Sequence, residues 1–441
     1  MIGIPSSRCR RRATAFSSAV RRNSVPKLAV LGGEPVRRQP LGRWPIITDE
    51  EVEAVTRVLR RGKLFASMYG SEEVAKFEEE FAAAMGVKRA VSVSSGTAAL
   101  DVVLRAIGLK LGDEVITTPY TFIATATSIV HNHAVPVFAD VDPKTRNIDP
   151  DDVKRKITER TKAIVVVHIA GHPAEMDEIM EIAEEKGLYV IEDAAQAHLA
   201  EYKGRKVGGI GHAAIFSFQE SKNMTAGEGG AITTNDDELA ERCISLREHG
   251  RRRDKPWYYH EALGWNYRLT EMQAAILRVQ LKRLPAVTEE RRRNAERLGK
   301  IISEFDFLRP SYVAPYVKHA YHLYLVDYDP SKLGVSKAVL ARAVQAEGVP
   351  LAEGYYWPVY ENPIFSDPER MPEVPFKLLG KQVRYGRGLC PVAEKLCYET
   401  GMWFPGHILN APAEELDDVA RALEKVEKAG DELREAARRL S

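Results

Sequence analysis

The chain has 441 residues, a formal net charge of +1 and a hydrophobic content of 44%. This near-neutral balance excludes the strongly basic class of nucleic-acid-binding proteins, and no run of about 18 apolar residues indicates a membrane span. We therefore expect neither a nucleic-acid partner nor a membrane partner.

The four cysteines, Cys9, Cys243, Cys390 and Cys397, show no CxxC spacing. There is also no HExxH motif, so the sequence predicts neither a disulfide framework nor a metal site. A reducing cytoplasm fits this pattern best.

The first 27 residues form a basic segment, because seven Arg and Lys residues precede the first acid, Glu34. An organelle transit peptide has this composition, and so does a disordered basic tail or a start site placed too far upstream. No apolar stretch follows the charges, which argues against a secretory signal.

Helices are predicted at 48–60, where Thr48 is a plausible N-cap, and at 70–85, where Val74, Phe77 and Phe81 share a face. Helical patterns at 97–107 and 176–186 then alternate with short β-rich runs. The seven runs are 90–94, 114–118, 135–141, 163–168, 189–193, 213–218 and 231–234. This alternation predicts an α/β fold with a mostly parallel sheet of seven strands between helices.

After a helical region at 270–296 the pattern changes to a strand at 321–328 and helices at 336–347 and 412–429. We therefore expect a large domain over 28–285 and a smaller C-terminal α+β domain over 286–441.

Lys222 follows a strand-like apolar run and precedes the glycine-rich stretch at 227–230, while Asp193 ends an earlier run. A lysine and a strand-end aspartate are what a pyridoxal 5′-phosphate (PLP) enzyme needs. The lysine amine forms a Schiff base with the cofactor, and the aspartate keeps the pyridine nitrogen protonated.

Three further features support this hypothesis only in combination. The turn Ser95-Gly96-Thr97 can present backbone N–H groups to a phosphate, but it also reads as an ordinary serine N-cap. Ser217 can bind the same phosphate or be a hydrogen-bonded residue of a buried strand. Phe122 can stack on the pyridine ring or belong to the core.

In open α/β sheets, ligands bind beyond the carboxyl ends of the strands. The four features that lie at or just past predicted strand ends are Ser95–Thr97, Asp193, Ser217 and Lys222. We therefore expect them to converge on one edge of the sheet.

Taken in order, the motifs resemble the DegT/DnrJ/StrS family of PLP-dependent sugar aminotransferases, a branch of the fold-type I aminotransferases. The resemblance covers about residues 28 to 426. It rests on 95–97, 121–125, 168–177, 192–196, 216–230, 249–251 and 266–275.

The resemblance implies roles for matching positions. Lys222 would be the catalytic lysine, and Asp193 would pair with the pyridine nitrogen. The remaining cofactor contacts would be Gly96, Thr97, Phe122, Gln196, Ser217 and Asn266. Asn266 would reach the phosphate of a neighbouring subunit, which implies a homodimer with shared active sites.

Within the family, the stretches at 168–176, 218–228, 319–324 and 354–360 look closest to glutamine:scyllo-inosose aminotransferases. They imply a glutamine or glutamate donor, a keto-cyclitol or keto-sugar acceptor, and substrate contacts at His172, His322 and Tyr356. Glu220 departs from the family, because a small residue is expected there.

Three alternatives stay open from the sequence. They are an aminotransferase for nucleotide-linked keto sugars, a PLP dehydratase or aminobenzoate-forming synthase, and a regulatory protein on the same scaffold. The donor's carboxylate needs a cation, and Arg251, Arg252, Arg253 and Arg268 are the candidates that the sequence offers.

Overall fold

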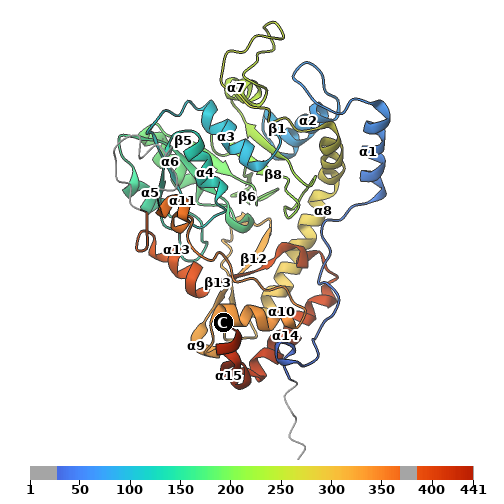
Figure 1. Ribbon diagram of the computed structural model, residues 1–441, viewed down its shortest axis with the longest axis vertical. Helices are drawn as coiled ribbons and strands as arrows, with labels where there is room; N and C mark the ends of the chain where they lie inside the picture. Colours follow the sequence, from blue (N-terminus) through green and yellow to red (C-terminus); the bar gives the residue numbers. More distant parts are fainter. Residues whose placement is uncertain (1–26, 368–384, 441) are drawn as a thin grey trace, which may run out of the picture.

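The computed structural model describes residues 27–367 and 385–440. The basic segment at 1–26, including Cys9, lies outside the described residues. Figure 1 shows a large domain above and a smaller domain below, with helix α8 running from one to the other.

A seven-stranded sheet forms the centre of the large domain, and all seven predicted runs are among its strands. Strand β9 pairs antiparallel with β1 and β8, and the other neighbours pair in parallel. In spatial order the strands are β1 (Arg89–Val93), β9 (Gly230–Thr234), β8 (Ala213–Ser217), β5 (Tyr189–Asp193), β4 (Thr161–Val167), β2 (Glu114–Thr117) and β3 (Val135–Phe138). The predicted α/β class with a mostly parallel sheet is confirmed.

Both faces of this sheet are buried, because successive side chains of a strand point to opposite sides. Val165, Ile191 and Ile215 pack in one core with helices on their side, whereas Ile164 and Phe216 pack in cores on the other. The large-domain helices are α2 (Glu73–Met85), α3 (Gly96–Ala106), α4 (Ala124–His131), α5 (Pro150–Lys156), α6 (Met176–Lys186) and α7 (Asp237–Arg247).

Helix α1 (Asp49–Arg61) begins as predicted at Thr48, where Thr48 and Glu51 form a capping box. It packs along α8 (Glu271–Ile302). A second capping box, formed by Thr270 and Gln273, lies at the start of α8. Helix α8 continues through Pro285, so the domain boundary expected after residue 285 falls inside one continuous helix.

The smaller domain contains an antiparallel sheet with strand order β10 (Leu308–Pro310), β12 (Leu323–Tyr328) and β13 (Gly401–Pro405). The helices after α8 are α9 (Pro330–Leu333), α10 (Lys337–Ala346), α11 (Pro363–Ser366), α13 (Pro391–Lys395), α14 (Asp417–Lys428) and α15 (Gly430–Leu440). A third, small sheet joins β11 (Val317–Lys318), β6 (Glu201–Tyr202) and β7 (Arg205–Lys206).

The N-terminal segment that was expected in the large domain packs against the smaller one. Leu28 and Leu41 are buried in the same core as α10 and α14. Glu347 fixes the segment by accepting hydrogen bonds from the backbone N–H groups of Ala29 (2.8 Å) and Val36 (3.1 Å).

Candidate active site

The strand ends bring the predicted residues to one edge of the sheet. Asp193 is the last residue of β5 and pairs in register with Ile215 of β8, two residues before Ser217. Ser95 and Gly96 follow β1, and Lys222 lies in the loop between β8 and β9. The expected convergence is therefore present, because these strand ends meet at the same edge.

The start of α3 forms a cradle with Ser217. Ser95 caps the helix, since its Oγ accepts a hydrogen bond from the N–H of Ala98 (3.0 Å). A Cβ added to Gly96 would lie 2.9 Å from Cβ of Ser217, and one added to Gly230 would lie 2.4 Å from the carbonyl oxygen of Ser95. Only a residue without a side chain fits at these positions, so the backbone N–H groups at the helix start stay accessible to an anion.

Asp193 is a buried carboxylate held by neutral donors. Thr125 donates its hydroxyl hydrogen to one oxygen (2.8 Å), and the backbone N–H of Ala195 donates to the other (3.2 Å). Burial raises the pKa of Asp193, although the hydrogen bonds and the charge of Lys222 oppose the shift. Within the described residues Asp193 has no ion pair, so a cation placed beside it would remove the cost of burying its charge.

Lys222 carries an amine that burial favours in its neutral form. Burial lowers the pKa of Lys222, and the negative charge of Asp193 partly offsets this. The described residues give the amine no hydrogen bond or ion pair. A neutral amine is the nucleophile that attack on an aldehyde requires.

Gln196 and Phe122 are two further predicted cofactor contacts. The Oε1 atom of Gln196 accepts the N–H of Ala170 (2.6 Å), and the side chain of Gln196 also hydrogen-bonds to Tyr355. Phe122 is 63% exposed and starts the helical turn that carries Thr125. Its exposure excludes the alternative that it is a core phenylalanine.

Beneath Asp193 lies a network that the sequence did not reveal. The fully buried Glu192 accepts hydrogen bonds from His168 (3.0 Å) and from the N–H groups of Gly208, Ile210 and Gly211 (2.9, 2.8 and 2.8 Å). Burial alone would raise the pKa of Glu192, but His168 and these N–H groups hold it below its ordinary value. A charged Glu192 therefore anchors the end of β5 and fixes the position of Asp193.

The three predicted substrate residues lie in different surroundings. His172 is buried, with Nδ1 2.7 Å from the carbonyl of Pro173 and Nε2 accepting the N–H of Ala314 (3.2 Å). No ring nitrogen of His172 is left for a substrate, so its role in the structure is to join two loops. Tyr356 is 64% exposed, whereas its neighbour Tyr355 packs edge-on against Tyr120.

Tyr355 hydrogen-bonds to the side chain of Gln196 and is less exposed than Tyr356. Burial raises the pKa of Tyr355, so its hydroxyl keeps its proton. His322 stays a prediction as a substrate contact; burial and the charges of Lys222 and Arg291 hold its pKa well below the ordinary value. Its Nδ1 has no partner among the described residues.

Asn266 is exposed on a loop that runs beside the cradle, where the N–H of Ser94 donates to the carbonyl of Tyr267 (2.7 Å). Glu220, where a small residue was expected, is also exposed. Its backbone carbonyl accepts a hydrogen bond from Nε1 of Trp44 (2.6 Å).

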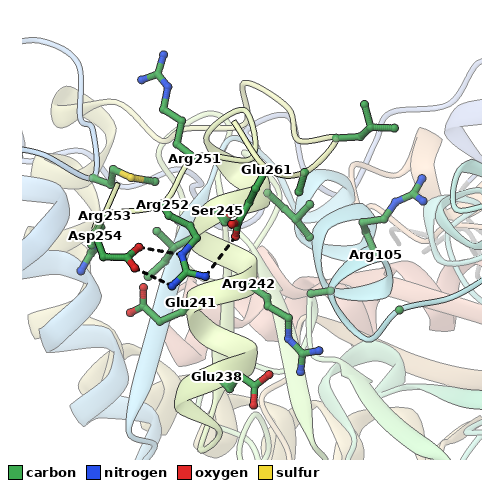
Figure 2. Close-up of a pocket in the computed structure, with 17 residues that line it drawn as sticks. Arg105, Glu238, Glu241, Arg242, Ser245, Arg251, Arg252, Arg253, Asp254 and Glu261 are labelled. Atoms are coloured by element: carbon green, nitrogen blue, oxygen red, sulfur yellow. Dashed lines mark hydrogen bonds and ion pairs between the residues drawn. The ribbon is translucent and has the colours of Figure 1, made fainter. Parts of the chain in front are cut away.

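Three of the four arginines expected to bind a carboxylate, Arg251, Arg252 and Arg253, line a hollow of about 990 Å³ beside α7. Figure 2 shows Arg252 between Asp254, at 2.8 Å, and Glu261, at 3.7 Å. Arg251 and Arg268 both approach the buried Glu248, at 3.5 and 3.9 Å. Arg251 and Arg252 therefore already have acidic partners.

These features define a fold-type I PLP enzyme. The residues present fit that cofactor, because a glycine cradle for an anion, a buried unpaired carboxylate and a lysine amine whose pKa burial lowers occupy one edge of the sheet. The chain belongs to the DegT/DnrJ/EryC1/StrS aminotransferase family, whose model matches residues 45–423. It is thus a PLP-dependent aminotransferase.

Known proteins agree with this assignment. An L-glutamine:2-deoxy-scyllo-inosose aminotransferase of Streptoalloteichus tenebrarius is 37% identical over 422 residues, covering 92% of this chain and 99% of the relative. An aminotransferase of Psychrobacter cryohalolentis superimposes with a TM-score of 0.79 at 37% identity, over 88% of this chain and 98% of that one. The structure of 3-amino-5-hydroxybenzoic acid synthase gives the same score at 30% identity, over 88% and 100%.

Among the described residues, no helix is both long enough and apolar enough to cross a membrane.

Proposed function

We propose that this aminotransferase moves an amino group from L-glutamine or glutamate to the ketone of a cyclitol related to scyllo-inosose. The observation that carries the proposal is the juxtaposition of Lys222, Asp193 and the Gly96 cradle in a chain similar to an L-glutamine:2-deoxy-scyllo-inosose aminotransferase over 99% of that relative. Because the similarity extends over nearly the whole relative, we expect the same two substrates here.

The chain's own residues divide the work at the cofactor. PLP supplies, when bound, an aldehyde that can react with an amine and a ring that withdraws electrons. Asp193 would keep the pyridine nitrogen protonated, and Gln196 would lie near the ring hydroxyl. The amine of Lys222 would carry protons to and from the reacting substrate carbon, first on the donor and then on the acceptor.

Binding of the cofactor is assigned to the cradle and to Phe122. The N–H groups of Gly96 and Thr97, together with the hydroxyl of Ser217, would bind the phosphate at the start of α3. The exposed side chain of Phe122 would stack on the pyridine.

The acceptor side of the site suits a polyhydroxylated ring. His322 is held neutral, so its ring offers both a donor and an acceptor to hydroxyl groups. Tyr355 adds a protonated hydroxyl, and Tyr356 stays a prediction for the entrance because it is exposed.

We further propose a cytoplasmic homodimer. Asn266 is exposed, and the loop before it exposes Trp257, Tyr258 and Leu263, the last at 87%. Such large apolar side chains on one loop favour an interface between copies. Cys243, Cys390 and Cys397 are free, which fits a reducing compartment.

The test is to follow the visible absorbance of the PLP-loaded protein while adding L-glutamine and then scyllo-inosose. Loss of the cofactor band with glutamine and its return with scyllo-inosose supports the proposal. Return only with a nucleotide-linked keto sugar assigns that acceptor class instead. Product analysis showing dehydration or aromatisation points to the reaction of an aminobenzoate-forming synthase.

A further inference from the structure

Three arginines are buried in the described part of the chain: Arg146, Arg247 and Arg291, at 0%, 5% and 2% exposure. Arg291 differs from the other two in its partners. Arg146 pairs with Asp327, and Arg247 pairs with Glu78. No carboxylate among the described residues pairs with Arg291, although burying an unpaired charge is costly.

Neutral groups hold the guanidinium of Arg291 in a defined orientation. Its Nε donates to Oδ1 of Asn410 (2.8 Å), its Nη1 donates to Oδ1 of Asn223, and its carbon lies 5.1 Å from the ring centre of Trp44. Its Nη2 has no hydrogen-bond partner in the portion of the chain that is described. Two amides and an aromatic face thus orient the positive charge without compensating it.

This charge lies beside the catalytic lysine. Asn223 directly follows Lys222, and its Nδ2 is held by the carbonyl of Ala320 (2.8 Å). The charges of both Lys222 and Arg291 contribute to the lowered pKa of His322. Burial lowers the pKa of Arg291 to about 10, so the guanidinium stays charged at neutral pH.

We propose that Arg291 binds the α-carboxylate of the amino donor. The inference rests on the proposed function, because it assumes an amino-acid donor at Lys222. A planar guanidinium can form two parallel hydrogen bonds with a carboxylate. The donor's carboxylate would also supply the negative charge that no described residue provides to Arg291. The alternative is that Arg291 only ties the loop of Lys222 to Asn410.

The experiment compares Arg291→Gln with Arg292→Gln in the full-length, PLP-loaded protein. Arg292 is a matched control, because it lies next on α8 but donates to the carbonyls of His319 (3.0 Å) and Leu199 (3.2 Å). The two donors are L-glutamine and 4-aminobutanamide, which is glutamine without its α-carboxylate. The rate of loss of the cofactor band gives kcat/KM for each donor without any acceptor.

We expect Arg291→Gln to lower kcat/KM for glutamine about 10- to 100-fold, the range for a hydrogen bond to a charged group, and to leave 4-aminobutanamide nearly unchanged. Arg292→Gln should leave kcat/KM for both donors unchanged. Binding of glutaramate, which keeps the carboxylate but has no amine to react, should raise the melting temperature of the wild type and not that of Arg291→Gln.

An equal loss with both donors, together with unaltered glutaramate binding, would overturn the proposal and leave Arg291 a structural anchor. If Arg291→Gln does not fold, Arg291→Lys is used instead, because it keeps the charge and removes the planar guanidinium. The proposal is then tested by the same comparison of kcat/KM for L-glutamine with kcat/KM for 4-aminobutanamide. If the wild type reacts with neither donor, the proposed function itself fails, which is a distinct outcome.

Discussion

Ionisable side chains at the sheet edge near Lys222 and in the hollow beside α7 differ in exposure and in ion pairing. In the hollow, Arg252 is half exposed and lies between two acids (Figure 2). At the sheet edge, Lys222, Asp193 and Arg291 are enclosed, and none has an ion pair within the described residues. An exposed, paired charge is worth little, whereas an enclosed, unpaired one is available to a ligand. The number of arginines in a region is therefore a poor guide to where a substrate binds.

The largest effect is expected from Lys222→Ala. The variant loses both the nucleophile and the proton carrier, so turnover should fall by about 10⁴-fold or more. A coupled assay of the aminated product measures this, with the exposed Lys203→Ala as control. Turnover at the wild-type rate would remove Lys222 from the mechanism.

Asp193→Asn should come next, with a loss of about 100-fold in turnover, because a neutral amide does not hold the pyridine proton. The pH dependence should also change. Asp193 raises the pKa of Lys222, so removing its charge lowers that pKa further. The amine is then neutral at lower pH, and the pH at which PLP loads at half its maximal rate should shift downward. An upward shift would contradict this assignment.

Gly96→Ala should weaken cofactor binding without abolishing it. The new Cβ would lie 2.9 Å from Cβ of Ser217, and such overpacking costs about 1–3 kcal/mol. PLP titration and thermal melting measure the effect. Gly70→Ala is the matched control, because a Cβ at Gly70 meets no atom within 4 Å.

The smallest effect is expected from Arg252→Ala in the hollow. Its ion pair with Asp254 is exposed and screened, so the melting temperature should stay within experimental error of the wild type. A melting temperature lowered by several degrees would show that charges in the hollow matter more to stability than this comparison allows.

Local signals explain why much of the site could be predicted. Asp193, Ser217 and the turn at Ser95–Thr97 follow short apolar runs, and a strand end is a local property of the chain. The same signal could not separate Tyr355 from Tyr356, because the neighbours differ only in which side each faces. Nor could it exclude His172, whose partner Ala314 is more than a hundred residues away in sequence.

The sequence by itself determined the alternation of strands and helices, the mostly parallel sheet, and the lysine and aspartate on which the chemistry depends. Hydrophobic periodicity and strand-end motifs act over a few residues, so they are visible in the chain alone. Tertiary structure decided which charges lack partners. Arg291 meets Asn223, Asn410 and Trp44 from three distant segments, and unlike Arg146 and Arg247 it has no ion pair within the described residues. Such contacts arise only when the two domains pack around α8, because burial and pairing are properties of the folded environment.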